Sequence, residues 1–424
     1  MKAAFPIQAA RTVALHTQGL TLKNGIEPTP TTDTLYGVIQ QLTCLQIDTL
    51  QRVHRTQYLV PWSRLGAYDP ALLDYLAYGD PEQSPPDNGR KLFEFWFHAA
   101  CYLPLEDFRF RLPRMRSSSV GRHERTRSWL AREDTQELLK QVYARVKKEG
   151  GLRARDFEDE TDKRDPWWDW KPAKNALEHL FSRGDLMIAD RIHFERVYNL
   201  TERVLPDWVD RSEPTHEQAA LHVIERSALA LGICSAAQIS DYSHDFKRTE
   251  SKPFIEQLLE EGRLLPVQVG LESGDAIELV IHRDNLPLME EAADGSLVAE
   301  RTTFLSPFDS LFYPRGRDAQ FWGFRQVLEA YKPAPQREWG YFCLPILHHE
   351  RLVGRLDPRL DRKKGRLHLE ALYLEPGVKP EEEMVTAIAA TMKDFMSFHQ
   401  AHDIIIENSQ PKAFASTLMR ALCE

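Results

Sequence analysis

The chain has 424 residues, of which 42% are hydrophobic and 28% are charged, as in ordinary globular proteins. This length exceeds a single hydrophobic core and predicts two to four domains, while the lack of any run of about 18 apolar residues argues against a membrane-spanning helix. The net charge of −9 does not exclude a polyanionic partner, because such binding depends on local charge.

The N-terminal part of the chain predicts three helices and a strand. We expect helices near residues 8–19, 32–43 and 70–78, a loop rich in proline, aspartate and glycine at 79–90, and a strand at 92–98. His98 ends this apolar strand. It is either a satisfied core histidine or part of a functional site in the same module.

The segment Leu45–Leu50 contains the most informative short motif, Gln46-Ile47-Asp48. Apolar and polar residues alternate, so Gln46 and Asp48 emerge on the same side if the segment is extended. An amide and a carboxylate together can hold and polarise one water molecule. The alternative is the polar edge of an ordinary core strand.

A repeat follows in the middle of the chain. Residues 177–186 and 255–264 share the apolar spacing of an amphipathic helix, and each has a glycine, Gly184 or Gly262, where a left-handed cap is needed. Strand-like sequence follows each glycine, predicting a hairpin around Asp190-Arg191 and another around residues 272–275. Helix, cap and hairpin together are typical of a winged helix-turn-helix.

From about residue 301 the pattern becomes strand-rich. We expect strands at 341–348, 351–356 and 366–374 and a closing helix at about 380–399. The tip between the last two strands, residues 361–365, is basic. The fold class predicted is therefore α+β, with three tandem winged helix-turn-helix domains followed by a small β-rich C-terminal domain. The expected boundaries are 1–132, 133–210, 211–300 and 301–424.

Two arginine-rich stretches, at residues 109–127 and 351–366, are either solvated basic faces or DNA-binding surfaces. Residues 165–172 contain Trp167, Trp168 and Trp170, which either stack on bases or anchor a core. The side chains that we expect to contact DNA are Arg64, His98, Lys171, Lys174, Arg355, Arg362, Lys363 and Lys364.

Several ordered motifs resemble one known family, the YcaQ/AlkZ-type winged-helix DNA glycosylases of bacteria. They are Leu45–Thr49, Tyr58–Gly66, Trp96–Cys101, Trp167–Pro172, Arg196–Val204, Leu305–Asp309 and Leu352–Asp357. The resemblance implies removal of alkylated purines and unhooking of interstrand crosslinks at guanine N7. It also implies catalytic roles for Gln46 and Asp48, the Gln-apolar-Asp form of the family signature. The loop at residues 79–91 is longer than the family's usual connection, which could alter substrate access.

The residues agree with that chemistry. An N7-alkylated guanine is cationic and leaves without a general acid, so one carboxylate with an amide partner suffices to support the sugar cation and deliver water. No lysine adjoins the motif, which predicts a monofunctional glycosylase without a Schiff-base step. A bulky crosslinked base favours an open site over a deep pocket.

We therefore expect a DNA N-glycosylase that acts on duplex DNA with alkylated or crosslinked guanine. We expect no cofactor, no metal, no membrane partner, and a monomer in the bacterial cytoplasm that joins the nucleoid when bound to DNA. Five scattered cysteines without a Cys-x-x-Cys pair argue against disulfides and a structural zinc site. The alternative is a non-enzymatic winged-helix DNA-binding protein or transcriptional regulator.

Overall fold

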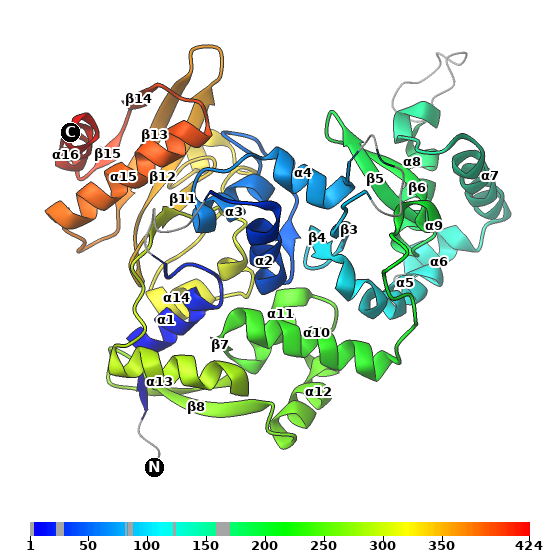
Figure 1. The fold of residues 1–424 in the computed structure, drawn as a ribbon, viewed down its shortest axis with the longest axis horizontal. Coiled ribbons are helices and arrows are strands. Elements are labelled where there is room, and N and C mark those ends of the chain that lie inside the picture. The colour runs from blue at the N-terminus through cyan, green and yellow to red at the C-terminus, as the bar shows by residue number, and fades with distance from the viewer. Residues whose placement is uncertain (1–3, 23–28, 81–82, 84–87, 122–123, 158–169) are drawn as a thin grey trace. The chain divides into compact units, whose positions relative to one another are not determined.

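The computed structural model describes residues 4–22, 29–80, 83, 88–121, 124–157 and 170–424 (Figure 1). The chain divides into two compact units, each of which is described by itself. The larger unit comprises Met1–Leu72 and Ile224–Glu424, and the smaller unit comprises Leu73–Val223. The division after Leu72 falls inside the segment 1–132 that the sequence predicts to be one domain.

The larger unit combines helices with two sheets. Its helices are α1 (Ile7–His16), α2 (Thr32–Leu42), α3 (Thr56–Leu65), α11 (Ala236–Ser243), α12 (Arg248–Glu260), α13 (Leu286–Asp294), α14 (Arg317–Trp322), α15 (Glu382–Phe398) and α16 (Lys412–Cys423). Its strands are β1 (Phe5–Pro6), β2 (Leu45–Gln46), β7 (Ile233–Cys234), β8 (Leu264–Gly270), β9 (Ala276–His282), β10 (Thr302–Phe304), β11 (Leu344–His348), β12 (Arg351–Asp361), β13 (Arg366–Leu374), β14 (Asp403–Ile406) and β15 (Ser409–Gln410).

The first sheet of the larger unit has the strand order β1-β8-β9-β7. The helix α10 (His216–Leu231) precedes β7, so the chain order α10-β7-α11-α12-β8-β9 is that expected of a winged helix-turn-helix. The cap predicted at Gly262 is present, with φ of +66°. The hairpin turn at residues 272–275 is also where the sequence predicts it.

The N-terminal helix α1 belongs to this first sheet. Ala10 and Val13 are buried in one apolar cluster with Ile233, Val269 and Met289. The short strand β1 runs parallel to β8. Residues 5–16 therefore pack with the third predicted module, although they lie more than 200 residues away from it in sequence.

The second sheet has the order β10-β11-β12-β13-β14, with β15 also paired to β13. The strands β12 and β13 form an antiparallel hairpin that closes at the pair Asp361 and Arg366, which confirms the predicted basic tip. The helix α15 contacts β10 and β11 of this sheet, and α16 packs along α15 (Figure 1).

The smaller unit contains a helical part and two hairpins. Its elements are α4 (Ala71–Tyr78), β3 (Leu92–Trp96), β4 (Ala100–Pro104), α5 (Leu112–Ser119), α6 (Glu124–Leu130), α7 (Glu133–Glu149), α8 (Trp170–Ser182), β5 (Leu186–Ile192), β6 (Glu195–Leu200) and α9 (Thr201–Val204). The helix α8 ends at the predicted cap, Gly184, with φ of +85°. The predicted mixed α+β class is thus confirmed.

Two details of the smaller unit differ from the sequence prediction. The hairpin turn is at His193-Phe194 rather than at Asp190-Arg191, because both turn residues adopt positive φ, of 53° and 70°. Arg191 instead remains in β5, where its guanidinium is bonded to the buried carboxylate of Glu94 at 2.7 Å.

Candidate active site

The Gln-Ile-Asp motif lies where the chain leaves the interior of the larger unit. Leu45 is fully buried and Ile47 is 6% exposed, as the alternating pattern predicts. Gln46, the last residue of β2, is also buried, at 7% exposed. Asp48 is half-buried and Thr49 is exposed, so the carboxylate is within reach of solvent.

The carboxylate of Asp48 is held by the backbone two residues further along the chain. Its Oδ1 accepts the backbone N–H of Leu50 at 2.8 Å, which is an Asx turn. No residue in the described part of the chain bonds its second oxygen, Oδ2. One oxygen is therefore fixed and the other is available to a water molecule or a substrate.

A residue that the sequence did not single out, Gln57, lies next to the motif. Its Oε1 accepts the backbone N–H of Asp48 at 3.4 Å. The side chain is completely buried, yet its Nε2 has no hydrogen-bond partner among the described residues. No local pattern in the sequence marks Gln57, because its contact with Asp48 depends on the packing of α3 (Thr56–Leu65).

The loop from Glu329 to Tyr341 belongs to the same unit and is held by hydrogen bonds to one of its own side chains. The buried carboxylate of Glu329 accepts the backbone N–H groups of Trp339 at 2.7 Å and Glu338 at 2.9 Å. Tyr331, on this loop, is 78% exposed. Desolvation, and then the negative charge of Asp48, raises the pKa of Tyr331, so the phenol is within electrostatic range of that carboxylate.

The segment that follows the motif contacts this loop. The guanidinium of Arg52 lies 5.0 Å from the ring centroid of Tyr341, and Arg337 lies 4.8 Å from the same ring. Arg52 is also paired with Glu370 at 2.5 Å. The surface around Asp48 therefore already contains an aromatic ring that binds cationic groups.

The basic hairpin tip packs against the same segment. The guanidinium of Arg362 donates to the carbonyl oxygen of Val53, and the N–H of Leu360 donates to the carbonyl oxygen of Arg52 at 3.0 Å. Lys363 and Lys364 are exposed at the end of the hairpin. The tip therefore packs against the segment that follows the Gln-Ile-Asp motif, although the two are more than 300 residues apart in sequence.

The tip also affects a histidine beside it. Burial, and then the positive charges of Arg362 and Arg55, lowers the pKa of His54 to about 4. The ring of His54 contacts that of His399, with centroids 5.2 Å apart. Burial lowers the pKa of His399 to about 3, so both imidazoles are neutral at pH 7.

Two arginines that the sequence predicts to contact DNA are structural instead. Arg64 is 2% exposed, and its guanidinium is bonded to Asp309 and to the carbonyl oxygen of Gln18. Arg355 is also 2% exposed and is paired with Glu375 at 2.7 Å. Neither guanidinium can reach a phosphate in this conformation. The predictions of DNA contact by Arg64 and Arg355 are therefore wrong, because long-range acidic partners bury both side chains.

The remaining predicted DNA contacts belong to the smaller unit. His98 lies in the turn between β3 and β4 rather than in the strand, which ends at Trp96. Lys174 is exposed on α8. Lys171 lies in the first turn of α8, and its side chain is outside the described part of the structure, as are Trp167 and Trp168.

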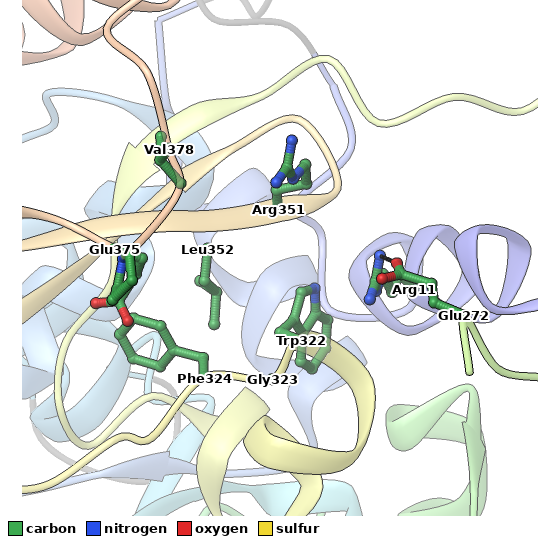
Figure 2. A pocket seen from close by; sticks show the side chains of 10 residues that line it. Arg11, Glu272, Trp322, Gly323, Phe324, Arg351, Leu352, Glu375 and Val378 are labelled. Carbon is green, nitrogen blue, oxygen red and sulfur yellow. Dashed lines mark hydrogen bonds and ion pairs between the residues drawn. The ribbon is translucent and has the colours of Figure 1, made fainter.

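A cavity of about 380 Å³ lies elsewhere on the larger unit (Figure 2). It is lined by Arg11, Glu272, Trp322, Gly323, Phe324, Arg351, Leu352, Glu375, Pro376 and Val378. None of these residues belongs to the motif. Figure 2 shows the guanidinium of Arg11 against Glu272, an ion pair of 2.9 Å, so the charge of this cation is already matched. The cavity is not part of the candidate site.

The five cysteines form no disulfide; Cys423 is exposed and the other four are buried. Among the described residues, no helix is both long enough and apolar enough to cross a membrane.

Comparison with known proteins identifies both a matching family and a similar solved structure. The model of a family described as DNA glycosylase AlkZ-like matches residues 39–398. A solved structure, the Streptomyces sahachiroi DNA glycosylase AlkZ, superposes with a TM-score of 0.62 over 96% of this chain and 100% of that chain, at 15% identity. At 15% identity, this match supports a similar fold and nothing more.

Proposed function

Because this chain belongs to the AlkZ-like family of DNA glycosylases, we propose that it hydrolyses the N-glycosidic bond of N7-alkylated guanine in duplex DNA, including guanines joined in interstrand crosslinks. Alkylation at N7 gives guanine a positive charge and makes it a good leaving group. The enzyme must then stabilise the sugar cation and supply water, and it needs no group to protonate the base.

In this proposal Asp48 supports the developing sugar cation and takes the proton of the attacking water. The carboxylate is half-buried, with one oxygen held by Leu50 and the other without a partner in the described structure. This arrangement, which suits a single bound water, is the observation that carries the proposal. Gln46 would orient the water, and the buried amide of Gln57 would fix the backbone of Asp48.

The absence of a lysine next to the motif in sequence supports a monofunctional reaction that leaves the sugar–phosphate backbone intact. The exposure of Thr49 and the partial exposure of Asp48 support an open site, in which a base enlarged by a crosslink need not enter a deep pocket.

DNA contact is assigned to the basic hairpin tip. Lys363 and Lys364 are exposed, and Arg362 packs against the segment that follows the motif. The exposure of the lysines and the packing of Arg362 support contact between the tip and phosphates beside the reacting nucleotide. We also propose that DNA is contacted by His98, Lys171 and Lys174. The domain organisation that we propose consists of three winged-helix modules, at 1–132, 133–210 and 211–300, and a β-rich module at 301–424.

Release of free base tests the proposal. The wild-type protein, incubated with N7-methylated duplex DNA, should release 7-methylguanine and leave abasic sites with unbroken strands. The same assay with a duplex crosslinked at guanine N7 tests unhooking. A protein that binds both duplexes and releases no base would instead be a non-enzymatic DNA-binding protein, the second candidate.

A further inference from the structure

Three side chains with metal-binding chemistry converge on the larger unit, apart from the Gln-Ile-Asp motif. They are His348 at the end of β11, His349 in the turn before β12, and Glu383 in the first turn of α15. The Nε2 of His348 lies 3.0 Å from one oxygen of Glu383, and the Nε2 of His349 lies 3.7 Å from the other.

The backbone makes this convergence possible. Neighbouring residues in a strand place their side chains on opposite faces. His349 instead has a left-handed φ of +55°, which histidine adopts only occasionally. The two imidazoles consequently stack, with ring centroids 4.1 Å apart and planes at 21°. Both Nε2 atoms then face the same carboxylate.

A hydroxyl group orients the more buried of the two rings. The Nδ1 of His348 lies 2.8 Å from the Oγ1 of Thr302 in β10. When Nδ1–H donates to that hydroxyl, the Nε2 of His348 carries a lone pair that points at a carboxylate. Metal-binding histidines are usually held in this way, by a hydrogen bond from the second ring nitrogen.

We propose that His348, His349 and Glu383 form a site for a divalent transition metal ion of the zinc class. The three ligand atoms lie within 4.8 Å of one another. Zinc binds histidine nitrogen and carboxylate oxygen at about 2.0–2.2 Å, so tetrahedral ligands lie roughly 3.3 Å apart. To aim its lone pair at the same ion as His348, the partly exposed ring of His349 must turn out of the stack, and the exposed side chain of Glu383 must shift to meet this spacing. A water molecule would complete the shell.

The bound ion would crosslink the turn between β11 and β12 to the first turn of α15. These elements are 34 residues apart in sequence, from His349 to Glu383. The site is independent of the glycosylase proposal, because none of its residues belongs to the surface around Asp48. It also differs from the zinc sites that cysteine spacing would reveal, since all three ligands are histidine or glutamate.

Metal titration of the full-length protein tests the proposal. The proteins carry no affinity tag. Each also carries Cys423→Ser, because the exposed thiol of Cys423 could itself bind the added metal. Calorimetric titration with Zn²⁺ and visible absorption of bound Co²⁺ are compared for the parent, His349→Asn and Glu383→Gln. Asparagine tolerates the left-handed backbone of residue 349, so this variant keeps the turn.

The matched control is His368→Asn. His368 also forms a histidine–carboxylate pair, with Glu407 at 2.8 Å, but does not belong to the group of His348, His349 and Glu383. We expect the parent and His368→Asn to bind one equivalent of metal more than His349→Asn and Glu383→Gln. Equal stoichiometry and affinity in all four proteins would overturn the proposal and leave a simple hydrogen-bonded pair of His348 and Glu383.

Discussion

The guanidinium of Arg362, at the tip of the β12–β13 hairpin, donates a hydrogen bond to the carbonyl oxygen of Val53, five residues beyond Asp48. This bond fixes the basic tip next to the segment that follows the candidate catalytic carboxylate. The exposed Lys363 and Lys364 at this tip are the side chains that we propose to contact duplex DNA.

Charge reversal at the tip should weaken DNA binding. We expect the double change Lys363→Glu and Lys364→Glu to lower affinity for duplex DNA and to reduce the slope of log affinity against log salt by about 1 for each phosphate that the protein no longer neutralises. Fluorescence anisotropy at several salt concentrations measures both quantities. Lys412→Glu, an exposed lysine on α16, is the control. If the tip variant and the control give the same slopes and affinities, the tip does not contact DNA.

The buried ion pair of Arg64 and Asp309 should be a large contributor to stability. Arg64→Met leaves the Asp309 carboxylate buried without its partner, which we expect to lower the free energy of unfolding by about 3–5 kcal/mol. Arg145→Met removes an exposed pair with Glu149 and should cost less than about 1 kcal/mol. Urea unfolding measures both. Similar losses in the two variants would refute the structural role of Arg64.

Stability should fall in acid because His54 and His399 are neutral in the folded protein. Their pKa values, about 4 and about 3, are below the value of about 6.5 in an unfolded chain, so the unfolded state binds more protons between these limits. The free energy of unfolding therefore decreases as pH falls from about 6.5, by at most about 1.4 kcal/mol per pH unit for each histidine.

His399→Gln tests this pH dependence. The variant removes one of the two protonation steps, so its urea midpoint should change less than the wild-type midpoint between about pH 6.5 and pH 4.5. The comparison of slopes is insensitive to a uniform loss of stability. Parallel profiles for the two proteins would show that His399 does not bind a proton on unfolding.

Tyr331 should stack on the cationic base. Base–aromatic stacking is worth about 1–3 kcal/mol, so Tyr331→Ala should lower kcat/KM for 7-methylguanine release by roughly ten- to a hundredfold, whereas Tyr331→Phe keeps the ring and should stay near wild type. Tyr75→Ala removes another exposed tyrosine and is the control. Wild-type release by Tyr331→Ala would show that the ring does not touch the base.

Local sequence signals predicted the parts of the fold that local geometry controls. Gly184 and Gly262 cap their helices as expected, since only a residue that tolerates positive φ continues the chain there. The basic hairpin tip was likewise visible in its turn residues. In contrast, α3 was not predicted; it contains Pro61, a residue that normally interrupts a helix.

Long-range contacts could not be predicted from one sequence. In a sequence, an arginine is a candidate phosphate ligand as long as its acidic partner is unknown. The partner of Arg64 is Asp309, which is 245 residues away. Gln57 and Tyr331 were likewise not predicted as site residues, because only the folded chain brings them near Asp48. Their relation to Asp48 arises from the packing of α3 and of the loop before β11, which no local pattern records.

The most direct test of the proposed function is the release of 7-methylguanine by Asp48→Asn under single-turnover conditions. Asparagine can still accept the Leu50 N–H, so the Asx turn should persist while the base is lost. We predict that excision falls by about two to four orders of magnitude and that affinity for the methylated duplex is retained. Release at the wild-type rate would contradict the catalytic role of Asp48.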